Sequence, residues 1–126
     1  MRRGLLVLCL VLASGPVAAQ TVNPSTLAFT ASTDHATVQR YELRLYYVGA
    51  PQPFTAYDLG KPALNEAGEI ILTNPSWFAT AAAGLACIGR VAAINADGEG
   101  LSLPSNEWVR LVAPAKGQVW IVVTGT

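Results

Sequence analysis

The stretch VQRYELRLYYV, residues 38–48, carries the clearest structural pattern in the chain. Its side chains alternate in character, as they do along a strand that buries one face and presents the other to solvent. The face expected to be buried holds Tyr41, Leu43, Leu45 and Tyr47, and the opposite face holds Glu42, Arg44 and Tyr46. We therefore expect a strand here that packs one side against a core.

Similar short segments follow one another along the chain, separated by Pro, Gly, Asn and Asp, which are typical of turns. We expect further strands at residues 26–32, 53–59, 68–73, 87–95, 106–113 and 118–124. Residues 96–100 are predicted as a turn, and residues 77–86 fit either a helical turn or a loop between sheets. About seven regularly spaced strands without a long helix predict an all-β fold, a β-sandwich.

The first twenty residues, MRRGLLVLCLVLASGPVAAQ, have the pattern of a secretory signal peptide. Two arginines precede an apolar run from Leu5 to Ala13, which is shorter than the roughly 20 residues of a membrane-spanning helix. Small residues precede the expected cleavage site between Ala19 and Gln20. The expected parts are a signal peptide at 1–19, a sandwich domain at 20–113 and an apolar strand extension at 114–126. The expected location is secreted or extracellular, with the periplasm as the alternative.

Composition argues against several classes of partner and chemistry. Six basic and eight acidic side chains follow residue 19, a net charge of about −2, which does not favour nucleic acid. His35 is the one histidine and Cys87 the one cysteine after residue 19, so a His/Cys metal cluster is not expected. The sequence shows no Gly-rich phosphate loop and no convincing catalytic triad. We therefore expect a protein that is not an enzyme and that has no cofactor and no metal.

Cys87 has no partner for an intramolecular disulfide, because Cys9 lies in the predicted signal peptide. We interpret Cys87 as a buried free thiol that acts as a small apolar side chain. The alternatives are an intermolecular disulfide and a reactive nucleophile.

Two segments, taken in order, resemble a known family. YELRLYYVG, residues 41–49, is similar to the third strand of fibronectin type III domains, which typically begins Tyr-Glu-Val. GRVAAINADGEGLSLPSNEW, residues 89–108, is similar to their sixth strand, turn and seventh strand, with the Ser-x-Pro-Ser pattern. The resemblance covers about residues 26–112. It implies a divergent seven-stranded immunoglobulin-like sandwich with a binding, spacing or structural role.

Two positions depart from the family pattern. The core Trp of its second strand corresponds to Ala31, and the core Tyr that opens its sixth strand corresponds to Cys87. Small side chains at both positions would hollow the interior, and replacing a buried aromatic by Ala costs about 3–5 kcal/mol. We expect other bulk to fill the space, from Trp77, Phe78 or Trp120.

The segment QVWIVVT, residues 118–124, shows no alternation, which is typical of a strand buried on both faces. The candidate assembly strand within it consists of Val119, Trp120, Ile121, Val122 and Val123. Pro114 and a turn at residues 116–117 permit the chain to reverse before it. Three placements stay open: folding back on its own domain, pairing with a neighbouring copy in a dimer or filament, and service as an anchoring signal or part of a further domain.

Tyr46, Tyr57 and Trp108 form the candidate aromatic contact surface, because aromatic rings stack on flat apolar faces such as those of sugars. The same residues equally fit core or cross-strand packing.

The function that the sequence favours is a secreted, non-enzymatic structural or protein-interaction module. The expected partner is protein, with a second copy of the chain as the first candidate, in a homo-oligomer or filament joined by C-terminal strand pairing. The alternative is a carbohydrate- or cell-surface-binding module that uses exposed aromatics and takes polysaccharide as its partner. We expect no nucleic acid partner and no membrane span after signal removal.

Overall fold

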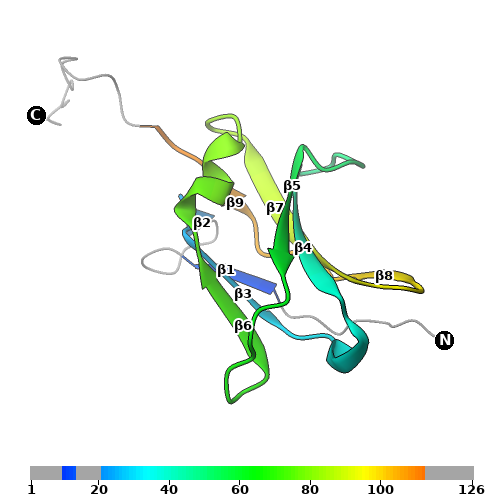
Figure 1. Cartoon of the computed structure of the whole chain (residues 1–126). Helices are drawn as coiled ribbons and strands as arrows, with labels where there is room; N and C mark the ends of the chain where they lie inside the picture. Colours follow the sequence, from blue (N-terminus) through cyan, green and yellow to red (C-terminus); the bar gives the residue numbers. More distant parts are fainter. Residues whose placement is uncertain (1–9, 14–20, 113–126) are drawn as a thin grey trace, which may run out of the picture.

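The computed structural model describes residues 10–13 and 21–112, and within these ranges the chain forms two β-sheets. The sheets face each other as two layers, with the apolar core between them (Figure 1). The predicted β-sandwich is thereby confirmed. The predicted strand at 118–124 and the extension from residue 114 lie outside the described residues.

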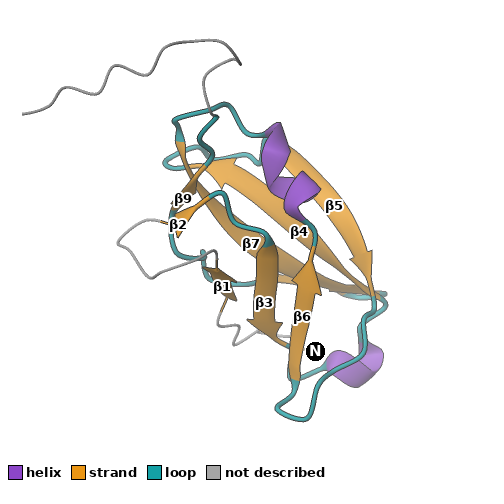
Figure 2. Cartoon of the chain, turned by 90° about the vertical axis from the view of Figure 1, so that its left-hand side faces the viewer, coloured by secondary structure: helices purple, strands orange, loops and turns teal. Residues whose placement is uncertain are grey.

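The smaller sheet has the strand order β1-β3-β6, and the larger has the order β2-β9-β7-β4-β5, with β8 also paired to β7. The smaller sheet consists of β1 (Leu10–Ala13), β3 (Thr26–Thr30) and β6 (Glu69–Thr73). The larger consists of β2 (Thr21–Val22), β4 (Arg40–Tyr47), β5 (Thr55–Gly60), β7 (Ala86–Asn95), β8 (Gly98–Leu101) and β9 (Trp108–Val109). Two 3-10 helices, η1 (His35–Thr37) and η2 (Pro75–Thr80), lie at opposite ends of the sandwich (Figure 2).

The antiparallel pair β4 and β7 forms the centre of the larger sheet. Its register runs without a break from Arg40 opposite Ile94 to Tyr47 opposite Cys87. The alternation that predicted β4 is present, because its residues Tyr41, Leu43 and Leu45 are fully buried in the core.

A hairpin replaces the turn that was predicted at residues 96–100. Asn95 pairs with Gly98, so only residues 96–97 lie in the turn itself, and β8 continues from Gly98 along β7. The Asn95 side chain accepts the backbone amide of Asp97 at 2.8 Å, which stabilises the tight turn. The turn prediction was therefore too wide, because two residues suffice for a hairpin connection.

The last described strand is shorter than the predicted 106–113. Only Trp108 and Val109 have strand geometry, and they pair antiparallel with β7 and parallel with β2. The preceding residues, 102–105, follow β7 through serine side chains instead of a regular ladder. The result is a strand order in which the first and last described strands of the larger sheet lie side by side.

The segment at 77–86, for which two structures were open, begins as part of η2. The side chain of Asn74 accepts the backbone amide of Ser76 at 3.2 Å and so caps the first turn. Pro75 follows as a residue already restricted to a helical φ. This turn directs Phe78 into the core.

The core contains a large aromatic side chain that the comparison with the family pattern did not predict. Ala31 and Cys87 are buried small side chains, as expected. Trp108, however, lies directly opposite Cys87 in the ladder, and the ring of Phe78 packs edge-on against it at a centroid distance of 5.2 Å. Phe78 was one of the three expected sources of bulk and Trp108 was not. Because Phe78 and Trp108 already fill this part of the interior, the packing gives no reason to expect Trp120 there.

The strand β1 was not predicted, and it comes from the stretch predicted to be a signal peptide. It pairs antiparallel with β3, from Leu10 opposite Phe29 to Ala13 opposite Thr26. It therefore forms the edge of the smaller sheet (Figure 1). No helix in the described part of the chain is long and apolar enough to cross a membrane.

Candidate functional site

Trp108 belongs to the core and not to a contact surface. Its side chain is 0% exposed, and its indole Nε1 has no hydrogen-bond partner within the described residues. The prediction that Trp108 forms part of an exposed aromatic surface is wrong. Strand β9 has only two residues, so alternation along it cannot show which side chain faces the core. In the structure the Trp108 ring faces inward.

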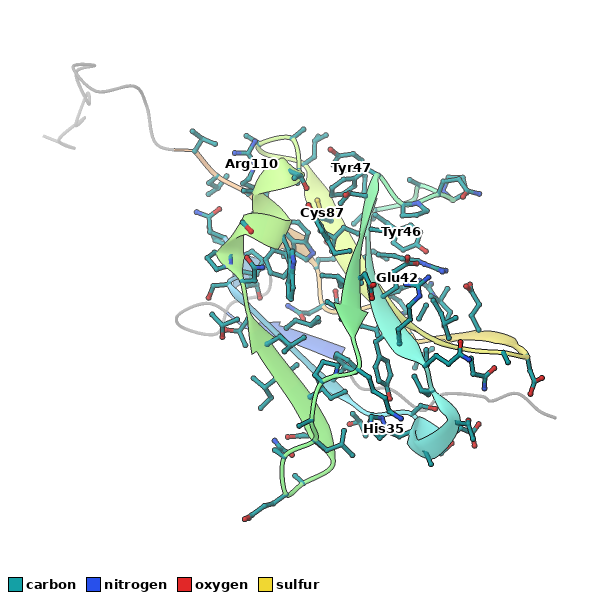
Figure 3. The ribbon with its side chains drawn as sticks, viewed as in Figure 1. His35, Glu42, Tyr46, Tyr47, Cys87 and Arg110 are labelled. Atoms are coloured by element: carbon teal, nitrogen blue, oxygen red, sulfur yellow. The ribbon has the colours of Figure 1, made fainter. Side chains whose placement is uncertain are left out.

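The two tyrosines of the predicted aromatic surface do not combine into one platform either. Tyr46 lies on the outer face of β4, as predicted, but is only 8% exposed, because β4 is an inner strand and Ile88 lies directly opposite (Figure 3). Tyr57 is half-buried beside Trp77, with the ring centroids 6.2 Å apart, and its hydroxyl donates to Thr80 at 3.2 Å. Stacking on a sugar needs an open ring face, which Tyr46 and Trp108 do not offer.

Cys87 is a buried free thiol on the inner face of β7 (Figure 3). Its Sγ lies 3.3 Å from the carbonyl oxygen of Leu85, which accepts a weak hydrogen bond. Burial raises the pKa of Cys87 to about 11, so the thiol is neutral at physiological pH. A neutral, enclosed thiol suits the interpretation as an apolar side chain and not the alternatives of nucleophile or intermolecular disulfide.

His35 packs on the buried ring of Tyr41 at the η1 end of the sandwich. The two rings stack with centroids 5.8 Å apart, and His35 Nδ1 shares a hydrogen bond of 2.7 Å with the Tyr41 hydroxyl. The same hydroxyl accepts the backbone amide of Ser32 at 3.3 Å. Burial, and to a smaller extent the positive charge of Lys61, hold the pKa of His35 below its ordinary value of 6.5. The contacts fix η1 against β4 and suit a neutral imidazole.

A ladder of opposite charges crosses the outer face of the larger sheet. The guanidinium of Arg44 binds both carboxylate oxygens of Glu99 on β8, at 2.7 and 2.8 Å, and its Nε binds Glu42 at 2.7 Å. Arg40 lies 3.5 Å from Glu42 and 3.7 Å from Asp58. The hydrogen bonds between Arg44 and Glu99 lower the pKa of Glu99 and raise that of Arg44. Paired in this way, the charges connect β4, β5 and β8.

The described ranges 10–13 and 21–112 contain no group of three or more His, Cys, Asp and Glu side chains placed to hold a metal ion. The sequence expectation of a chain without a metal stays a prediction.

Exposed apolar side chains gather at the end of the sandwich where β9 finishes. The loop before β7 joins two neighbours there: the Val48 amide donates to Ala86 at 3.0 Å, and the Gly84 amide donates to Arg110 at 2.8 Å. We call the exposed apolar residues around these contacts the end patch, which consists of Val48, Leu85, Leu111 and Val112. Their side chains are 48–60% exposed. Sequence reasoning missed this patch, because its members come from three separate segments.

No protein family matches the chain, and no curated protein does. Among solved structures, the chain is similar to "Titin kinase and its flanking domains", at 12% identity and a TM-score of 0.45. The similarity covers 86% of this chain, which spans only 18% of that one.

Proposed function

We propose that the chain is an exported, non-catalytic module, related to fibronectin type III domains, that serves as a structural or protein-interaction unit. The relationship to that family rests on the ordered segments at 41–49 and 89–108. Export rests on the pattern of residues 1–19. The burial of Tyr46 and Trp108 weakens the alternative of a polysaccharide-binding module.

The end patch is the observation that carries the interaction role. Apolar side chains that are about half exposed and lie at one end of the sandwich are candidates for contact with another protein. The patch includes Leu111 and Val112, which directly precede the residues leading to the apolar segment 118–124. The partner proposed first is a second copy of this chain, joined patch to patch, because one apolar surface suits another of the same shape in a two-fold dimer.

Light scattering of a chain that begins at Gln20 tests self-association through the end patch. Leu85→Asp introduces a charge into a surface where Leu85 is 51% exposed, so it should shift the protein to a monomer. Leu64→Asp is the matched control, because Leu64 is also exposed, at 40%, but lies in the loop before β6. A protein that is monomeric at every concentration, or two variants that behave alike, would contradict this interface.

Export is tested separately by the N-terminal mass of the protein recovered outside the cytoplasm of an expressing cell. A chain that begins at Gln20 is the expected result. Protein that stays in the cytoplasm with Met1 still attached contradicts it.

A further inference from the structure

The edge of β3 is covered by residues that the mature protein is expected to lose. All four residues of β1 pair with β3, and all four lie upstream of the predicted cleavage after Ala19. We propose that removal of residues 1–19 frees this edge and that the apolar segment 118–124 of the same chain then pairs with it. The inference rests on the proposed export, since without cleavage β1 keeps its place.

An uncovered β3 would be an unprotected edge. Its sequence Thr26–Thr30, TLAFT, contains no charged residue and no proline. Charged residues and prolines normally discourage an edge strand from pairing with another strand. Two other edge strands carry a charged residue that discourages such pairing: β5 of the larger sheet contains Asp58, and β6 of the smaller sheet begins with Glu69. The β3 edge therefore has the strongest need for a covering strand.

The described chain ends close to where β3 begins. The Leu111 amide donates to the side chain of Asn23 at 2.9 Å, and the Asn23 amide donates to the carbonyl of Val109 at 2.9 Å. Asn23 precedes the first residue of β3 by three positions, a span of about 10 Å in extended chain. Residues 113–117 can span about 17 Å, so the segment 118–124 can reach the edge.

The direction of pairing follows from the same contacts. A segment that enters from the Asn23 end runs along β3 from Thr26 toward Thr30. It would therefore pair parallel with β3, whereas β1 pairs antiparallel.

The apolar character of the segment suits both faces of the vacated position. β1 lies near β7 of the facing sheet, so a strand in its place presents one face to the core. On the outer face its neighbour is Ala28, and on the far side of β3 lies Ile71 of β6, which is 53% exposed. Apolar side chains on this face would extend the apolar surface that Ala28 and Ile71 form. Attachment to the same chain gives the segment a high effective concentration, which favours pairing within one molecule over pairing between molecules.

Hydrogen exchange of the β3 amides in the chain 20–126 tests the proposal. Alternate amides of β3 face the vacated edge, and we expect them to exchange at least about tenfold more slowly than in the chain 20–112. Substituting Ile121→Pro should abolish the protection, because proline cannot donate to a ladder. Gly125→Pro, outside the segment, is the matched control. Equal exchange in 20–126 and in its Ile121→Pro variant would overturn the proposal.

If the chain 20–112 does not fold by itself, a peptide comprising residues 113–126 provides a second test. Added to 20–112, it should restore the folded state and the β3 protection, and the same peptide with the Ile121→Pro change should not. Failure of the unsubstituted peptide to restore either property, while 20–126 is folded, would count against the β3 edge as the acceptor.

Cysteine crosslinking identifies which chain supplies the strand. With Ala28→Cys on the outer face of β3, a second cysteine placed at each of residues 119–123 in turn should form an intramolecular disulfide at some positions. Crosslinked dimers instead of monomers would show strand donation between copies and overturn pairing within one chain. Dimers lost in Leu85→Asp report on the end patch, whereas changes in β3 exchange report on the edge, so the two proposals fail separately.

Discussion

Ser105 and Gly89 exchange two hydrogen bonds, one of which uses a side chain in place of the backbone. The Ser105 amide donates to the Gly89 carbonyl at 2.8 Å, and the Gly89 amide donates to the Ser105 hydroxyl at 2.8 Å. Ser102 and Val91 repeat the arrangement, with both distances at 2.9 Å. The two serines thus continue the pairing of β7 across the gap between β8 and β9.

Ser105→Ala should lower the free energy of unfolding by about 1–3 kcal/mol, because the buried Gly89 amide would lose its acceptor. Ser102→Ala should have a similar effect through Val91. Urea denaturation measures both, with Thr33→Ala as the control, because Thr33 carries an exposed hydroxyl. Serine variants as stable as the Thr33 variant would show that water or a backbone shift replaces these bonds.

Trp108→Ala should destabilise the fold by about 3–5 kcal/mol, because it removes a fully buried ring that packs on Phe78. Trp108→Phe should cost less, since it keeps an aromatic ring and removes an indole N–H that lacks a partner among the described residues. Thermal unfolding distinguishes the two variants. A Trp108→Ala protein of unchanged stability would contradict the buried position.

Cys87 should make stability fall at alkaline pH. An unfolded thiol ionises near pH 9.0, and burial raises the pKa in the fold to about 11. The folded state therefore holds its proton more tightly, so its advantage is complete below pH 9 and is lost progressively as the pH rises through 11. Cys87→Ala should flatten this part of the pH profile. Native protein should also resist thiol reagents at pH 8 and react once unfolded in urea; rapid labelling without urea would refute this.

His35 should make stability fall at acidic pH, in the opposite sense to Cys87. Its pKa in the fold lies below 6.5, so the folded state favours the neutral ring. The contribution is present above pH 6.5 and is lost as the pH falls through the lowered pKa. His35→Gln should remove this dependence, and the pKa itself can be followed by NMR titration of the ring. A measured pKa above 6.5 would contradict the expected direction.

Glu99→Gln should weaken the hairpin formed by β7 and β8 slightly, by less than about 1 kcal/mol, because Glu99 lies near the surface. The wild-type contribution is present above the ordinary carboxyl pKa and declines as the pH falls through the lowered value. A double-mutant cycle with Arg44→Met isolates the pair, and its coupling should shrink in 1 M salt. A salt-independent coupling would exclude an electrostatic origin.

The sequence predicted the positions of most strands, but it did not predict the burial of every side chain on them. β4 and β7 were predictable because each is long enough for alternation to identify a buried face. β9 was not, since two residues carry no period, and the face assigned to Trp108 was therefore wrong. Tyr46 shows a different limit: its face was assigned correctly, but its burial depends on the neighbouring strand β7, which only the register reveals.

The contact surfaces escaped prediction for a related reason. The end patch draws Val48, Leu85 and Leu111 from three segments, and no local pattern connects them. The pairing of β1 with β3 was hidden because an apolar run near a chain start has the pattern of a signal peptide, whatever strand it can form.

The parallel pairing of β2 with β9 has a consequence for the order in which the molecule forms. Thr21 lies beside Trp108, and Asn23 bonds Leu111, 88 positions further on. Contacts between such distant parts of a chain close a large loop and slow folding. A ribosome adding about 5–20 residues per second releases the first partner several seconds before the second. The larger sheet therefore stays incomplete through most of synthesis, and the N-terminal part of the chain has left the ribosome well before that sheet can form.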